Sequence, residues 1–189
     1  MENHSCSSIL ETENEMDPKH TFVFLITAVC FLAEGTARTF FLQSEFRKQN
    51  SCMGGNLMKF HKDTACQALK GPCQAKCDGA STRDVNTRFS IVDVRGLRCI
   101  QFTDKHSNTK YALKIKHGTN DIVFEKRQCD NSIGSDFLFT EKKVSGMFKY
   151  MHRNTMCLGI SSNCDDTNLH LLITRSNDKR CLFKKFRRL

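Results

Sequence analysis

A pattern that occurs three times constrains the fold more than any other feature of this chain. Each copy opens with a short apolar strand, has a Leu that is expected to face inward, and closes with another apolar strand. The Leu residues are Leu69, Leu113 and Leu158, which are 44 and 45 residues apart. One copy cannot bury its apolar face alone, so the repeat predicts three units that pack together. The opening strands are expected at 57–60, 99–102 and 147–150, the middle strands at 74–79, 121–126 and 170–175, and the closing strands at 88–94, 136–142 and 181–186.

The fold class follows from this repeat and from the turns between its strands. Short apolar runs alternate with Gly-, Asn- and Asp-rich turns, which is typical of an all-β domain. Three four-stranded units resemble a β-trefoil, a closed six-stranded barrel capped by three hairpins, and closure leaves no exposed strand edge. An open β-sandwich with a coincidental repeat is the alternative. The expected core residues are Leu69, Leu113, Leu158, Phe89, Ile91, Phe137, Phe139, Leu182 and Phe183.

The N-terminal part of the chain predicts secretion. Residues 1–37 are interpreted as a leader, because the 13 apolar residues from Thr21 to Ala33 are too few to span a bilayer core of about 30 Å as a helix. Small residues follow at Gly35 and Ala37, as in a signal-peptide cleavage site, and a start at Met16 would give a short basic lead. An uncleaved signal anchor or a buried apolar helix are the alternatives. After cleavage we expect no membrane insertion, a flexible polar arm over 38–56, and the trefoil domain with its basic tail over 57–189.

Cysteine usage supports the same location. The chain has 11 Cys, of which nine follow the leader, so at least one thiol is expected to be free or to pair between chains. A secreted protein with this many Cys usually forms disulfides, and the pairing remains open. Cys66, Cys73 and Cys77 are close enough in sequence to suggest zinc, but no second pair of ligands completes a site. We therefore expect disulfides, no metal and no cofactor.

The segment DFLFTEKKVSGMF, residues 136–148, carries a more specific pattern. It resembles the fibroblast growth factor signature, in which an acidic residue and Cys precede x-Phe-x-Glu, six residues and Tyr. The spacing matches, whereas Phe137 replaces the Cys and Phe148 replaces the Tyr. The resemblance covers roughly residues 57–186. It implies a secreted growth factor that activates receptor tyrosine kinases with heparan sulfate as co-ligand, and that is not an enzyme.

The resemblance also implies a receptor site. Glu141 would accept hydrogen bonds from the receptor and Phe148 would fill an apolar pocket, which is typical hot-spot chemistry. The alternative is a hairpin turn in which Glu141 is solvated and Phe148 packs inward. The implied receptor-binding residues are Glu141, Gly146, Phe148, Lys184 and Phe186.

The basic C-terminus indicates an acidic partner. The chain carries a net charge of +9, and seven of the last fifteen residues are basic. Guanidinium forks match sulfate and carboxylate groups, and lysines add point charges. The acidic residues Asp165 and Asp166 would weaken heparin affinity. The expected heparin-binding residues are Arg175, Lys179, Arg180, Lys185, Arg187 and Arg188.

Other functions fit the sequence less well. No nucleophile elbow, phosphate loop or zinc-protease motif occurs, so neither an enzyme nor a nucleic-acid partner is expected. An interleukin-1-like cytokine would use the same fold without heparin. A secreted trefoil that binds polyanions or carbohydrate without signalling is the second alternative.

Overall fold

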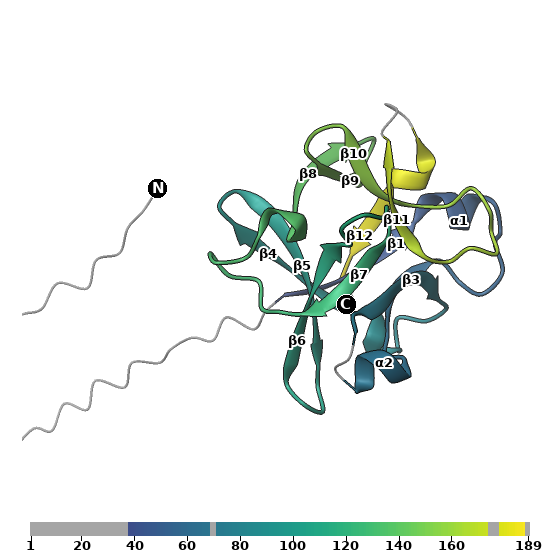
Figure 1. Cartoon of the computed structure of the whole chain (residues 1–189). Coiled ribbons are helices and arrows are strands. Elements are labelled where there is room, and N and C mark those ends of the chain that lie inside the picture. Colours follow the sequence, from purple (N-terminus) through teal and green to yellow (C-terminus); the bar gives the residue numbers. More distant parts are fainter. Residues whose placement is uncertain (1–37, 69–70, 174–177, 188–189) are drawn as a thin grey trace, which may run out of the picture. The chain divides into compact units, whose positions relative to one another are not determined.

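The computed structural model describes residues 38–68, 71–173 and 178–187, which form a β-structure of three successive runs of four strands (Figure 1). The first run contains β1 (Thr39–Ser44), β2 (Leu57–His61), β3 (Cys73–Gly79) and β4 (Phe89–Val94). The second contains β5 (Leu97–Asp104), β6 (Thr109–Ile115), β7 (Ile122–Lys126) and β8 (Leu138–Val144). The third contains β9 (Met147–His152), β10 (Met156–Ile160), β11 (Leu169–Ile173) and β12 (Phe183–Phe186). Short helices are α1 (Glu45–Gln49), α2 (Thr64–Gln67) and the 3-10 turns η1 (Val85–Thr87), η2 (Ser135–Phe137) and η3 (Lys179–Cys181).

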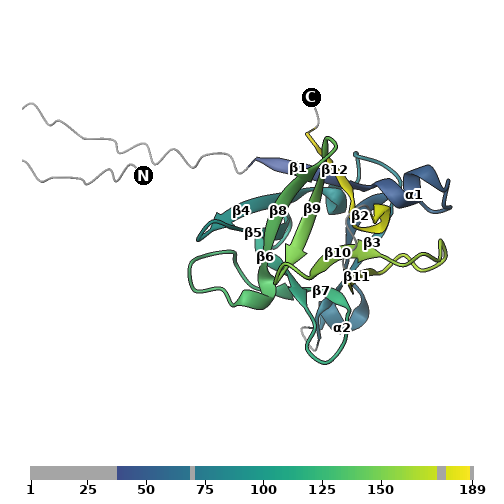
Figure 2. The same cartoon turned by 90° about the horizontal axis from the view of Figure 1, so that it is seen from above.

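Antiparallel pairing closes six of these strands into a ring. The ring runs β1–β4–β5–β8–β9–β12 and returns to β1. The remaining strands form the hairpins β2–β3, β6–β7 and β10–β11. Strand β3 pairs with β7, and a bridge joins Asp121 to His170, so the hairpins meet one another at one end of the ring (Figure 2). The fold is β-trefoil-like, and the predicted all-β class is confirmed.

The core lies inside the ring because alternate residues of each strand face inward. Each ring strand supplies one side chain with no exposed surface to a central layer, which we define as Leu42, Phe89, Ile100, Phe139, Tyr150 and Phe183. Of the predicted core residues, Leu113 and Leu158 are fully buried, and Phe137 and Leu182 are each 7% exposed. Ile91 is half-buried against the core, and Leu69 lies outside the described residues.

The predicted flexible arm over 38–56 is wrong. Residues 39–44 form β1, which occupies the place in the ring that β5 and β9 occupy in the other runs. Phe41 and Leu42 are buried, and the Ser44 side chain caps α1 by accepting a hydrogen bond from the Arg47 amide. The prediction rested on the polar, Gly-rich sequence after Gln49 and overlooked the short apolar strand before it.

The register of the first repeat needs a second correction. Residues 57–60, predicted as its opening strand, belong to β2 and therefore to a cap hairpin. Strand registers make Met58 the counterpart of Leu113 and Leu158, the role predicted for Leu69. Met58 is fully buried.

Eight of the nine described Cys form disulfides. The pairs are Cys52–Cys164, Cys66–Cys73, Cys99–Cys129 and Cys157–Cys181. Cys77 is a buried free thiol, and burial raises its pKa to about 12. Four disulfides indicate an oxidising, extracellular location. Within the described ranges, no group of three His, Cys or carboxylate side chains could hold a metal ion, and no helix is long and apolar enough to cross a membrane.

Candidate functional site

Two layers of side chains lie below the central layer, at the end of the ring away from the cap hairpins. We call this end the barrel mouth. The turns β4–β5 and β8–β9 and the outer ends of β1 and β12 reach it. Moving two residues along each strand from the central layer gives a lower layer, whose members are all half-buried. The lower layer consists of Phe40, Ile91, Arg98, Glu141, Phe148 and Lys185.

An ion pair occupies the lower layer. Lys185 Nζ donates to Glu141 Oε2 at 2.6 Å, and the two side chains are only 16% and 14% exposed. The same ammonium lies 4.0 Å from the ring centroid of Phe148 and 5.4 Å from that of Phe40. A carboxylate and two aromatic faces therefore compensate the desolvation of the lysine. The segment 136–148 thus contributes an acid, Glu141, and an aromatic ring, Phe148, that both contact Lys185.

Tyr150 lies directly above this ion pair. It is opposite Glu141 in the β8–β9 register and has no exposed surface. Burial and the nearby Glu141 carboxylate raise the pKa of Tyr150. Its hydroxyl therefore stays protonated and adds no charge beside the ion pair.

The rim of the mouth, two residues further along the strands, is cationic and exposed. Arg38, Lys143 and Arg187 lie there, and none forms an ion pair with a residue that the structure describes. The guanidinium carbon of Arg187 lies 4.8 Å from the Phe40 ring centroid. The rim carboxylate of Asp93 is already paired with Arg98. Five cations therefore face two carboxylates in the mouth: Arg38, Arg98, Lys143, Lys185 and Arg187 against Asp93 and Glu141.

A tight turn brings Lys143 to the rim. Val144 pairs with Met147, so Ser145 and Gly146 form a two-residue hairpin turn. Both have positive φ angles, 49° and 80°, which the twist of a hairpin favours and glycine adopts without strain. Gly146 is exposed, and its contribution to the mouth is this backbone conformation.

Further positive charge lies on the outer surface of the same strands. Lys142 and Lys184 are exposed, and no described carboxylate pairs with either. Lys142 is opposite Lys149 in the β8–β9 register, and burial together with Lys142 lowers the pKa of Lys149. Phe186 stacks on Phe41 with ring centroids 5.4 Å apart. The charge of the mouth thus continues onto the outside of β8 and β12.

The structure divides the predicted heparin residues among different places. Arg187 lies at the rim, whereas Lys185 is the partner of Glu141 and Arg175 and Arg188 lie outside the described residues. Arg180 is held by Asp178 at 2.6 Å, and this bond lowers the pKa of Asp178. Lys179 is exposed in η3, at the other end of β12 from the mouth.

The receptor and heparin sets, predicted as separate, meet at the mouth. Glu141 and Phe148 both contact Lys185. Glu141 is not solvated, and Phe148 packs inward as the hairpin alternative expected. Three residues of the mouth, Arg38, Phe40 and Lys143, were not predicted from the sequence. The alternation of β1 and the position of Lys143 two residues after Glu141 would have pointed to them.

A separate hollow lies where the cap hairpins meet. Its volume is about 290 Å³. Apolar side chains and a few polar groups line it, and the polar groups are Asp63, Gln74, Lys116, Asp121 and Asn168. It is therefore a second place at which a polar ligand could be sought.

Known proteins match this chain in shape but not in sequence. No family model and no curated protein matches it. The designed threefold-symmetric protein ThreeFoil superposes with a TM-score of 0.54 and 13% identity, covering 78% of this chain and 96% of its own. The likeness is one of fold.

Two natural proteins give the same result. A mosquitocidal holotoxin matches with a TM-score of 0.60 and 12% identity over 82% of this chain and 18% of its own. A lectin of Polyporus squamosus, solved with a human-type influenza-binding epitope, matches with a TM-score of 0.53 and 8% identity over 79% and 48%. The chain thus spans less than half the length of either protein.

Proposed function

We propose that this protein is an extracellular β-trefoil-like protein that binds sulfated polysaccharide at the barrel mouth, without enzymatic activity and without a cofactor. The proposal rests on the exposed positive charge of the rim. Arg38, Lys143 and Arg187 are exposed and form no ion pair with a described residue, while the two carboxylates of the mouth, Asp93 and Glu141, already have cationic partners. A polyanion would therefore meet positive charge without first displacing an internal carboxylate.

The chemistry of the rim favours sulfate over a neutral sugar. Two of its three cations are arginines, whose planar forks suit sulfate and carboxylate oxygens. The aromatic rings at the mouth, Phe40 and Phe148, already contact cations. One protein of similar fold, the Polyporus squamosus lectin, is bound to a three-sugar epitope, and for this chain a sulfated glycan suits a net charge of +9.

Heparin chromatography with a matched control tests the proposal. Replacing the three rim cations by Gln should lower the salt concentration at elution and reduce the log–log salt slope of binding by roughly 2 to 3, as expected when about three counterions are no longer released. The control is the triple variant Lys48→Gln, Arg83→Gln and Lys105→Gln, which removes the same charge from exposed residues away from the mouth. If both variants eluted at the same lower salt concentration, heparin binding would depend on net charge alone, and the barrel mouth would not be the binding site.

A receptor ligand of the growth-factor type is the second candidate. The Glu141–Phe148–Lys185 cluster favours it, because a half-buried acid, an aromatic ring and a cation together resemble the anchor of a protein interface. Lys184 and Phe186, on the outer face of β12, would extend that surface. Binding to ectodomains of fibroblast growth factor receptors, with and without heparin, measured by surface plasmon resonance, tests this candidate. Heparin retention without receptor binding would leave only the first function.

A further inference from the structure

One of the four disulfides differs from the rest in its surroundings. Cys52 and Cys164 are both half-buried, whereas the six other paired Cys are at most 6% exposed. The bond connects the loop after α1 to the loop between β10 and β11, across 112 residues of sequence. Exchange requires a thiolate to reach a disulfide sulfur, so accessibility favours this bond over the buried ones.

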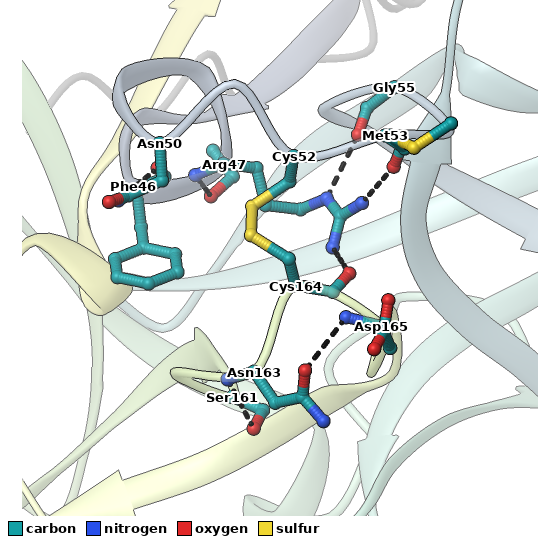
Figure 3. Close-up of a disulfide and its surroundings, with 11 residues drawn as sticks. Phe46, Arg47, Asn50, Cys52, Met53, Gly55, Ser161, Asn163, Cys164 and Asp165 are labelled. Atoms are coloured by element: carbon teal, nitrogen blue, oxygen red, sulfur yellow. Dashed lines mark hydrogen bonds between the residues drawn. A yellow bond between two sulfur atoms is a disulfide. The ribbon is translucent and has the colours of Figure 1, made fainter.

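A buried arginine holds both sides of this disulfide (Figure 3). Arg47 is 1% exposed. Its guanidinium donates to the carbonyl oxygens of Gly55 at 2.9 Å, Met53 at 2.6 Å and Cys164 at 2.7 Å. All three acceptors are neutral backbone groups, so no carboxylate in these contacts cancels the positive charge.

This arrangement has two consequences for disulfide chemistry. A positive charge next to a cysteine stabilises its thiolate, and a more stable thiolate leaves faster in exchange. In addition, Arg47 binds the carbonyl of Cys164 and the carbonyls of Met53 and Gly55 in the loop that carries Cys52, and none of these contacts is made through the sulfur atoms. The two thiols would stay close, and the bond could form again.

The chain beyond Cys164 is also fixed independently of the disulfide. The Cys77 amide donates to the Thr167 carbonyl at 2.7 Å, and Lys76 forms a β-bridge with Asn168. The Cys77 thiol itself is buried, and burial raises its pKa to about 12, so little thiolate is present to compete in exchange. Opening of the bond should therefore be local.

We propose that Cys52–Cys164 is a thiol–disulfide exchange site for external dithiol reductants, while the other three disulfides are structural. One thiolate of the reductant attacks a sulfur of the bond, forms a mixed disulfide and releases the other Cys as a thiolate. The second thiol of the reductant then resolves the mixed disulfide. Two electrons and two protons pass to the protein, which gains two thiols, and the reductant leaves as a disulfide.

Timed alkylation tests the proposal. The folded protein is incubated with dithiothreitol, quenched with iodoacetamide and mapped by peptide mass spectrometry. Cys52 and Cys164 should be labelled at least about tenfold faster than any buried pair, as access controls exchange. After removal of the reductant and addition of oxidised glutathione, the same bond should re-form. First labelling of a buried pair, or labelling of all eight Cys together, would overturn the proposal.

A pair of double variants separates exchange from general loosening. Cys52→Ser with Cys164→Ser should keep the near-UV circular dichroism spectrum and the heparin elution of the wild type, because Arg47 and the β-bridge hold the loops. Cys99→Ser with Cys129→Ser is the matched control and should change the near-UV spectrum, because both of these Cys pack in a buried apolar cluster. If the Cys52–Cys164 variant unfolds instead, the bond is structural and the proposal fails, whereas heparin binding by the mouth is judged separately.

Discussion

Removing the Glu141 carboxylate tests the ion pair of the barrel mouth. Glu141→Gln keeps the size of the side chain but leaves the Lys185 ammonium, 16% exposed, without its counter-ion. Loss of one partner from a fully buried pair costs about 3–5 kcal/mol. Partial exposure and the rings of Phe148 and Phe40 reduce this, so we expect a loss of about 2–3 kcal/mol in the free energy of unfolding. For a domain of this size the melting temperature should fall by roughly 5–10 °C.

A double-mutant cycle measures the coupling itself. Lys185→Met leaves an apolar chain to pack on the two rings, and the double variant removes both charges together. We expect the double variant to be less destabilised than the sum of the single variants, with a coupling energy of about 2 kcal/mol. Urea unfolding followed by fluorescence or circular dichroism gives all four stabilities. A coupling below about 0.5 kcal/mol would refute the reasoning, since Glu141 and Lys185 would then be independent in solution.

Three further predictions concern the core, the acid response and the free thiol. Leu113→Ala and Leu158→Ala should each cost about 2–5 kcal/mol by loss of burial and creation of a cavity, and unchanged melting temperatures would contradict the barrel register. The hydrogen bond from Arg180 lowers the pKa of Asp178 in the folded protein. This bond therefore stabilises the fold at pH values above about 3.9, the pKa of Asp in the unfolded chain, and its contribution is lost as the pH falls through the pKa of the folded state. Asp178→Asn should therefore be less stable than the wild type at pH 7, by about 1–2 kcal/mol, with the difference shrinking in urea unfolding at acidic pH; a difference that does not depend on pH would contradict this. Cys77 should resist iodoacetamide in the native protein and react in urea, and fast native labelling would show that it is not buried.

The repeat predicted the architecture because it encodes burial directly. Leu113 and Leu158 occupy equivalent buried positions, and the closing strands at 88–94, 136–142 and 181–186 coincide with β4, β8 and β12 within two residues at each end. The first repeat was harder, because 12 residues separate β1 from β2 and include α1. That insertion moved the apparent start of the repeat from Thr39 to Leu57.

Several residues of the candidate site could be predicted from the sequence, but the contacts between them could not. The motif singled out Glu141 and Phe148, and the basic C-terminus singled out Lys185 and Arg187. That Lys185 neutralises Glu141 depends on β9, which pairs with both β8 and β12 and so brings them to the same part of the ring. In the sequence, 38 residues lie between the end of β8 and the start of β12. Sequence separation of this kind gives no local signal. Asp178 and Arg180 are only two residues apart, but the basic character of the segment drew attention to Arg180 as a free cation and not to its pairing with Asp178.

Chemical-shift mapping by nuclear magnetic resonance tests most directly whether the barrel mouth is the binding site. The ¹⁵N-labelled protein is titrated with a sulfated heparin oligosaccharide, and the same oligosaccharide without sulfates is the control. The sulfated ligand should shift the amides of residues 38–40, 142–148 and 184–187, and the desulfated one should not. Shifts confined to the hollow where the cap hairpins meet, at residues 116–123 and 168–170, would contradict the account and place the ligand at the opposite end of the fold.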